Sequence, residues 1–217
     1  MIRNAIAISV AVGAFGVSFG VLATSAELSV AQAMAMSLLV FTGASQFAAV
    51  SVVAAGGALS AAVGSALLLA MRNTAYGLAL AATLGGGAGR RALAAHLVVD
   101  ETAAMALAQP SPDRRRRAFW LTAALLFSLW NAGTLIGALG AQRFGNPERL
   151  GLDVAFPAAF IALVAPQLRR ADARTAAALG VAIALVCVPF VPAGVPVIAA
   201  AAAAVVVGLR SGRRVDA

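Results

Sequence analysis

An arginine inside an apolar stretch is the first candidate for chemistry in this sequence. Arg72 stands in the segment 71–77 (MRNTAYG), with mostly apolar residues on both sides. An ionisable side chain at membrane depth costs at least about 2.5–3.5 kcal/mol to insert. Arg72 and Tyr76 are four residues apart and share one helix face. With Asn73 adjacent, a guanidinium beside a phenol suits the binding of a carboxylate. Alternatively, Arg72 reaches the headgroup layer or pairs with a structural carboxylate.

His96, Asp100 and Glu101 form a second group of ionisable residues in an apolar run. On a continuous helix, His96 and Asp100 share one face and Glu101 points about 100° away. A His–carboxylate pair inside a membrane can relay protons, and a carboxylate can also bind a substrate ammonium or neutralise Arg72. We predict that Asp100 or Glu101 carries a coupling proton, with His96 as its modulator, or that Glu101 does so alone. The alternative is an interfacial segment whose charges face headgroup water.

A third group surrounds a glycine in the middle of an apolar run. Thr42, Ser45 and Gln46 fall on one helix face, and Gly43 can open the helix or let a neighbour approach. Broken helices expose backbone groups to solutes at membrane depth. We therefore predict a disturbed helix near Gly43 to Gln46, with Ser45 or Gln46 beside a solute path. The alternative is close helix packing with interhelical hydrogen bonds.

Other kinds of chemistry have less support. An intramembrane serine protease would need Ser45 as nucleophile and His96 as base, because His96 is the only histidine. One His and two adjacent carboxylates lack the usual spacing of a metal site. The sequence has no lysine, which excludes a Schiff base and a P-loop. The single cysteine, Cys187, excludes an intrachain disulfide. We expect no catalytic residues, no metal and no cofactor.

The elements that position these residues must be membrane helices. Hydrophobic residues make up 62% of the 217 residues and charged residues 11%, whereas a soluble domain carries roughly 25% charged residues. The 16 basic residues are all arginines in short clusters between apolar runs, a distribution typical of topology determinants. The sequence predicts an all-α integral membrane protein in contact with the lipid bilayer, with no nucleic-acid partner.

About 20 apolar residues can span a bilayer as a helix. We predict one transmembrane domain over 1–217, a polytopic bundle of seven or eight helices with one or more broken. The expected spans are 4–25, 29–55, 58–83, 92–108, 118–141, 151–168, 175–191 and 194–210. The run 92–108 is short and charged, so it either spans or only dips into the membrane. Both versions favour a cytoplasmic C-terminus and leave the side of the N-terminus open.

Small residues mark two expected packing sites and a connection. The pairs Gly16–Gly20 and Gly133–Gly137 have GxxxG spacing, which is typical of close helix contacts. The glycine-rich stretch 85–89 predicts a flexible connection. Trp130 lies too deep in its run for a residue of the aromatic belt at the membrane interface.

The three groups, in this order, resemble the AzlC-type large subunit of bacterial branched-chain amino acid exporters. The matching segments are 15–20 (FGVSFG), 43–47 (GASQF), 72–77 (RNTAYG), 100–102 (DET) and 153–160 (DVAFPAAF). Similar sequences often carry Asn two residues before the arginine and His directly after it, where this chain has Ala70 and Asn73. That departure bears on substrate preference more than on fold.

The resemblance implies a permease that exports valine, leucine, isoleucine and methionine across the bacterial cytoplasmic membrane, driven by an ion gradient. It also implies a small, separately encoded AzlD-type membrane subunit as partner. The substrate-binding candidates are then Gly43, Ser45, Gln46, Arg72, Asn73 and Tyr76, and the coupling candidates are His96, Asp100 and Glu101. The competing interpretations are the protease, and a channel or assembly subunit without a transport cycle of its own.

Overall fold

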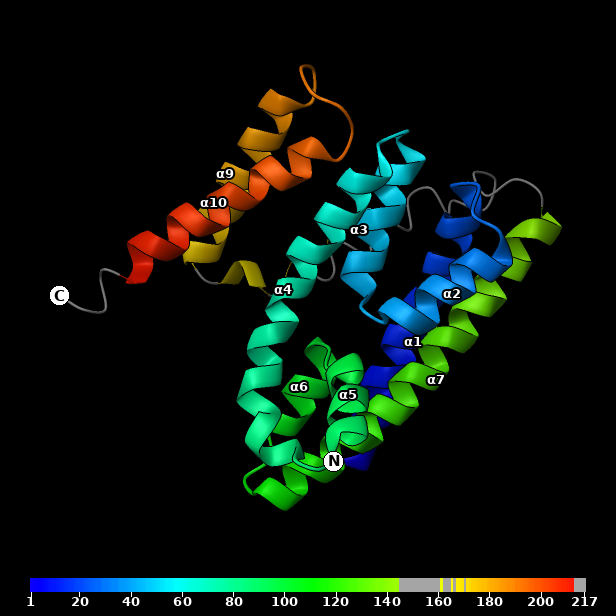
Figure 1. The fold of residues 1–217 in the computed structure, drawn as a ribbon, viewed down its shortest axis with the longest axis vertical. Coiled ribbons are helices and arrows are strands. Elements are labelled where there is room, and N and C mark those ends of the chain that lie inside the picture. Colours follow the sequence, from blue (N-terminus) through cyan, green and yellow to red (C-terminus); the bar gives the residue numbers. More distant parts are fainter. Residues whose placement is uncertain (145–160, 162–164, 166, 170, 213–217) are drawn as a thin grey trace.

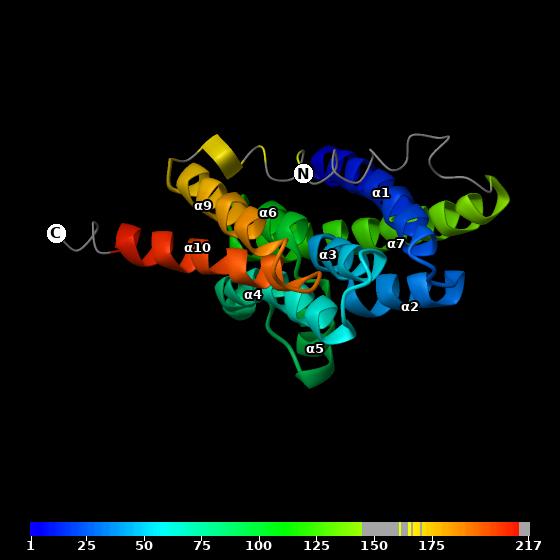
Figure 2. The same ribbon diagram turned by 90° about the horizontal axis from the view of Figure 1, so that it is seen from above.

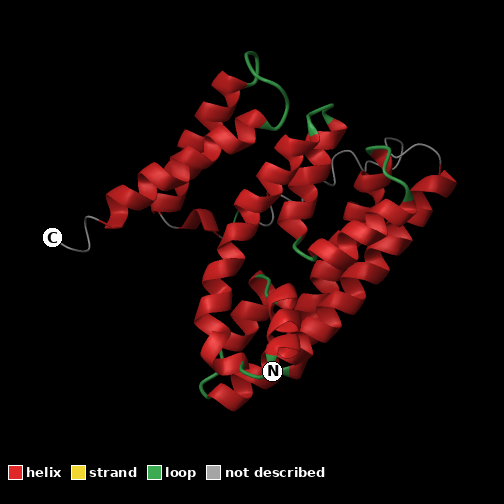
Figure 3. Ribbon diagram, in the orientation of Figure 1, coloured by secondary structure: helices red, strands yellow, loops and turns green. Residues whose placement is uncertain are grey.

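The computed structural model describes residues 1–144, 161, 165, 167–169 and 171–212, and every regular element in these ranges is helical (Figure 3). Three helices are long and apolar enough to cross a membrane: α1 (Ile2–Ser25), α4 (Leu59–Leu84) and α7 (Pro112–Phe144). They correspond to the expected spans 4–25, 58–83 and 118–141. The predicted all-helical fold class is thus confirmed for the described residues, and these three helices are candidate membrane spans by length and composition.

Helices α1 and α7 form the closest pair in the fold, and glycines make this approach possible (Figure 1). A Cβ on Gly16 or Gly20 would overlap backbone atoms of α7, and one on Gly133 or Gly137 would overlap backbone atoms of α1. The predicted role of both GxxxG pairs in packing is confirmed. The largest fully buried side chains include Phe19 on α1 and side chains of the neighbouring helices. The core of the bundle therefore lies against the pair of α1 and α7.

The run 29–55 is two helices, as the prediction of a break near Gly43 requires. Helix α2 (Val30–Val40) ends at Phe41, which adopts left-handed backbone angles (φ 39°, ψ 41°). Thr42 is extended, and α3 (Gly43–Ala54) begins after it. Left-handed angles cost a residue with a Cβ roughly 1–2 kcal/mol, so contacts around Phe41 must hold this break in place.

The run 92–108, expected either to span the membrane or only to dip into it, is also interrupted. Helix α5 (Ala88–Leu97) ends before the extended residues Val98 and Val99, and α6 (Asp100–Leu107) begins after them. The Thr102 hydroxyl accepts the N–H of Val99 at 2.9 Å and lies 2.9 Å from the Leu97 carbonyl. A local hydroxyl that bonds backbone groups competes with helix continuation, and acidic residues favour the start of a new helix.

The two broken segments form helical hairpins that enter the bundle from opposite ends (Figure 1). The first hairpin, α2 and α3, lies between the end of α1 and the start of α4. The second hairpin, α5 and α6, lies between the end of α4 and the start of α7, beyond a glycine-rich connection that starts at Gly85. At 1.5 Å per residue each short helix is about 12–18 Å long, roughly half the hydrocarbon thickness of a bilayer. The residues at both breaks, Phe41, Thr42, Val98 and Val99, are buried, so both breaks lie inside the bundle.

The C-terminal helices pack as a separate pair beside α4 (Figures 1 and 2). They are α9 (Ala171–Cys187) and α10 (Val195–Gly212), preceded by the short 3-10 helix η2 (Gln167–Arg169). They correspond to the expected spans 175–191 and 194–210. Most of the expected span 151–168, with the segment 153–160 of the family resemblance, lies outside the described residues.

We predict that Gly137→Ala destabilises the protein by roughly 1–3 kcal/mol, because its methyl group would overlap the backbone of Val17 on α1. Gly140→Ala on the same helix is the matched control, since no atom lies within 4 Å of a Cβ at Gly140. Thermal unfolding of the purified protein in detergent measures both. Equal melting temperatures for the two variants would show that the α1–α7 contact tolerates the added methyl group.

Candidate functional site

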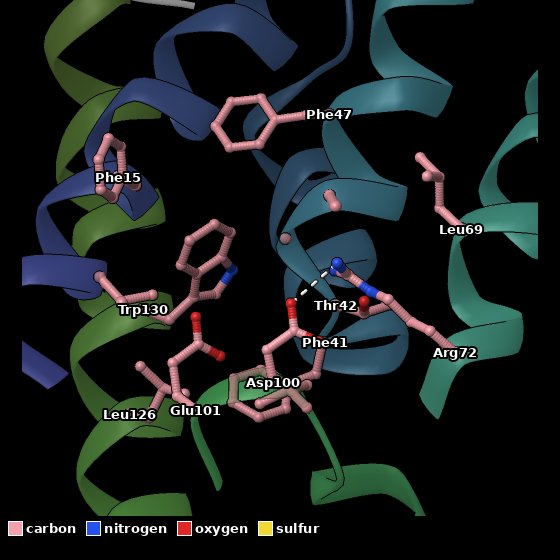
Figure 4. A pocket seen from close by; sticks show the side chains of 14 residues that line it. Phe15, Phe41, Thr42, Phe47, Leu69, Arg72, Asp100, Glu101, Leu126 and Trp130 are labelled. Carbon is pink, nitrogen blue, oxygen red and sulfur yellow. Dashed lines mark ion pairs between the residues drawn. The ribbon is translucent and has the colours of Figure 1, made fainter. Parts of the chain in front are cut away.

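A cavity of about 230 Å³ lies where the two helix breaks meet. This is slightly below the roughly 300–1,000 Å³ of pockets that hold drug-sized ligands, which suits a small solute. Its walls come from α1, the first hairpin, α4, the second hairpin and α7 (Figure 4). The lining residues are Val12, Phe15, Phe41, Thr42, Gly43, Ala44, Phe47, Leu69, Arg72, Val99, Asp100, Glu101, Leu126 and Trp130.

An ion pair between α4 and α6 crosses one side of the cavity. The Nη1 atom of Arg72 lies 2.8 Å from Oδ2 of Asp100, and each side chain is about a third exposed (34% and 33%). The pair joins the second hairpin to a spanning helix at the point where the hairpin turns. The pair agrees with the expectation that a carboxylate of the second group can neutralise Arg72, and Arg72 also lines the cavity.

Glu101 supplies a carboxylate that the ion pair does not neutralise. It follows Asp100 in the first turn of α6 and lines the same cavity. Within the part of the chain that the structure describes, Glu101 makes no ion pair. The Oδ1 atom of Asp100 is also buried without a hydrogen-bond partner. One guanidinium therefore faces two carboxylates, and this side of the cavity can accept a proton or a cation.

Aromatic contacts hold the first break against the second hairpin. The ring of Phe41 is buried at 3% exposure, with its centroid 4.8 Å from the ring of Phe127 on α7. The His96 ring lies 6.0 Å from both of these rings. His96 stands at the end of α5 and Asp100 begins α6, so the expectation that they share one helix face is wrong, because the helix is interrupted between them.

Two of the predicted site residues are buried in the first hairpin and do not line the cavity. The Gln46 amide is fully buried and donates a hydrogen bond to the Met36 carbonyl of α2 at 3.0 Å. Ser45 is 1% exposed, and its Oγ has no hydrogen-bond partner. Gly43, in contrast, lines the cavity at the first turn of α3. Contact of Ser45 or Gln46 with a solute stays a prediction.

The remaining candidates lie near the ion pair but outside the cavity wall. Tyr76 stands one turn after Arg72 on α4, within electrostatic range of Arg72, Asp100 and Glu101. The Oδ1 atom of Asn73 is buried without a partner. Of the sequence candidates, the structure brings together Gly43, Arg72, Asp100 and Glu101 at the cavity and leaves Asn73, Tyr76 and His96 beside it.

The protease interpretation has no geometric support. The Ser45 Oγ makes no hydrogen bond, whereas a nucleophile requires its base within about 2.6–3.2 Å. His96 packs on aromatic rings. Within the described ranges, no three His, Cys, Asp or Glu side chains lie together as metal ligands would.

Trp130 is one lining residue that sequence reasoning did not place in a site. It is 4% exposed and stacks on Phe19 of α1 with ring centroids 6.1 Å apart. Its indole Nε1 has no hydrogen-bond partner. The signal in the sequence was the position of Trp130 deep in an apolar run, because a buried indole N–H usually finds an acceptor.

Comparison with known proteins identifies relatives over most of the chain. The family model described as "AzlC protein" matches residues 7–144, which include every lining residue of the cavity. Two curated relatives from Helicobacter pylori, strains J99 and 26695, are each named "Uncharacterized membrane protein". Each is 32% identical over 174 residues, covering 79% of this chain and 76% of the relative. No solved structure matches this chain.

We predict energetic coupling of about 1–2 kcal/mol between Arg72 and Asp100 in stability. Arg72→Gln and Asp100→Asn should each lower the melting temperature, since each leaves the partner's charge uncompensated in the bundle. The double variant should recover part of the loss. Arg72→Gln combined with Glu27→Gln is the control, because Glu27 is exposed beyond the end of α1. Additive effects for Arg72 and Asp100 would contradict the coupling.

Proposed function

Because this chain belongs to the AzlC family of membrane proteins, we propose that it is a subunit of a secondary transporter that exports branched-chain amino acids. The observation that carries the proposal is the meeting of two broken helices, from opposite ends of the bundle, at one cavity with an ion pair and an additional carboxylate. Discontinuous helices that meet at mid-depth are a common way for transporters to bind solutes.

The two sides of the cavity suit the two parts of an apolar amino acid. Figure 4 shows the carboxylates of Asp100 and Glu101 on one side and the rings of Phe15 and Phe47 on the other. An ammonium group requires an acceptor such as a carboxylate, whereas a branched aliphatic side chain gains roughly 25 cal/mol per Å² of apolar surface removed from water. A small pocket with a few polar groups and mostly apolar walls provides both.

Glu101 offers a physical route to proton coupling. Arg72 already pairs with Asp100, so the charge of Glu101 is left for a proton or for the ammonium group of the solute. A carboxylate that holds a proton loses its attraction for an ammonium group, so the two occupants exclude each other. If protons bind from outside and solute from the cytoplasm, this exclusion gives proton-driven export.

A small AzlD-type membrane subunit is the partner that family membership supports, and the bacterial cytoplasmic membrane is the location. Alternating access would then move the hairpins relative to the spanning helices while the solute stays in the cavity. The ion pair between Arg72 and Asp100 is a contact that such a movement would change.

Arg72→Ala should reduce valine export by about tenfold or more, because loss of the guanidinium leaves Asp100 and Glu101 as two unpaired carboxylates. The measurement is efflux of labelled valine from preloaded cells that express this chain with its small partner subunit. Arg91→Ala is the matched control, since Arg91 is exposed on α5. Membrane levels of each protein are compared by immunoblot. Absence of valine, leucine and isoleucine efflux from the parent itself would overturn the proposed function.

Glu101→Gln should abolish the pH dependence of export, since an amide cannot take up a proton. In the parent, efflux of labelled valine should rise when the outside is made more acidic than the cytoplasm. In Glu101→Gln the remaining flux should stay flat over the same range, while the control Glu27→Gln keeps the parental profile. A parental pH profile in Glu101→Gln would place the coupling group elsewhere.

A further inference from the structure

We propose that the start of α3 and the indole N–H of Trp130 together form a carboxylate subsite in the cavity. This subsite rests on the proposed function, because it assigns an orientation to an amino acid bound there. The solute carboxylate lies at the N-terminus of α3, its ammonium group lies at Glu101, and its side chain faces the apolar wall.

The first support is a buried donor without an acceptor. Trp130 is 4% exposed and lines the cavity, and its Nε1 has no hydrogen-bond partner. In Figure 4 this nitrogen lies on the edge of the indole that faces Arg72 and Asp100 across the cavity. An unsatisfied buried donor is destabilising, so a ligand that supplies an acceptor gains from it.

The second support is the uncapped start of α3. Its N-cap residue, Thr42, makes no side-chain cap hydrogen bond, and its first turn contains no acidic residue. The first N–H groups of a helix have no partner within it and carry a partial positive charge, which is why helix N-termini bind anions. Gly43 and Ala44, in this first turn, line the cavity. Helix α6 differs, because Asp100 and Glu101 occupy its own first turn.

The indole ring of Trp130 lies against the start of α3. A Cβ built on Gly43 would lie only 3.0 Å from Cη2 of Trp130. Glycine therefore lets the bare backbone of the first turn of α3 approach the indole. The start of α3 and the indole of Trp130 are therefore neighbours in the cavity wall, and in the proposed subsite the solute carboxylate accepts from both.

The charged side chains that line the cavity set the orientation. Arg72 already bonds Asp100, and its Nε is buried without a hydrogen-bond partner. With Glu101 beside this pair, two carboxylates face one guanidinium, so a third carboxylate there would be repelled. An ammonium group is favoured at Glu101, and the solute carboxylate is left with the donors of α3 and Trp130.

The test is equilibrium binding of labelled valine to the purified protein, with isobutylamine as a competitor that lacks the carboxylate. Trp130→Phe keeps the ring and removes the N–H. It should weaken valine binding by about tenfold and leave the affinity for isobutylamine unchanged. Trp120→Phe is the matched control, because Trp120 is on the same helix and its Nε1 also lacks a partner, but it does not line the cavity. It should bind both compounds as the parent does.

Parental valine affinity in Trp130→Phe, or an equal loss of valine and isobutylamine, would overturn the subsite. If Trp130→Phe does not fold, the Trp120→Phe protein decides, since Trp130 is then its only tryptophan. Valine should shift the emission of Trp130 and isobutylamine should not; an emission that valine leaves unchanged also overturns the subsite. A parent that binds no branched-chain amino acid refutes the proposed function and the subsite together, whereas valine export with a negative tryptophan result refutes the subsite alone.

Discussion

Backbone N–H and C=O groups must find partners when a helix is interrupted at membrane depth, and the central part of this fold depends on that constraint. Lipid offers no hydrogen bonds, so irregular backbone is tolerated only inside protein or along a polar cavity. The second break is closed by the Thr102 hydroxyl, and the first hairpin is tied by the Gln46 amide. The backbone groups that remain at the start of α3 face the cavity. The site is thus a direct consequence of how the two breaks are satisfied.

The hairpins need a rigid support, and the contact between α1 and α7 supplies it. Glycines bring the two backbones together over several turns, which fixes the wall that carries Phe15, Leu126 and Trp130. A hydrogen bond also joins the first hairpin to this pair: the Ser37 hydroxyl donates to Thr134 Oγ1 of α7 at 3.1 Å. The polar contacts and the glycine contacts therefore stabilise the same region of the bundle, because both hairpins pack on α7.

Sequence reasoning identified the residues of this site whose type is energetically costly inside a membrane helix. A charge or a glycine at membrane depth demands an explanation, so Arg72, Asp100 and the break near Gly43 were predictable, and the ion pair followed from charge. The second break was not predictable. Its cause is the Thr102 hydroxyl, which bonds a backbone group and so competes with helix continuation, and apolar periodicity does not reveal this competition. The unpaired indole of Trp130 requires three-dimensional packing to recognise. Likewise, the burial of Ser45 and Gln46 depends on which face α2 covers, which one sequence leaves open.

Because the two hairpins enter from opposite ends of the bundle, they determine how much protein lies between the cavity and each end. Each half-helix is about 12–18 Å long, so a molecule at the breaks has one short hairpin on the side of α2 and α3 and another on the side of α5 and α6. A spanning helix would have to shift along its whole length to open such a path. A hairpin of two short helices can tilt as a unit about its two ends without a change in the glycine contact between α1 and α7, because neither of these helices belongs to a hairpin.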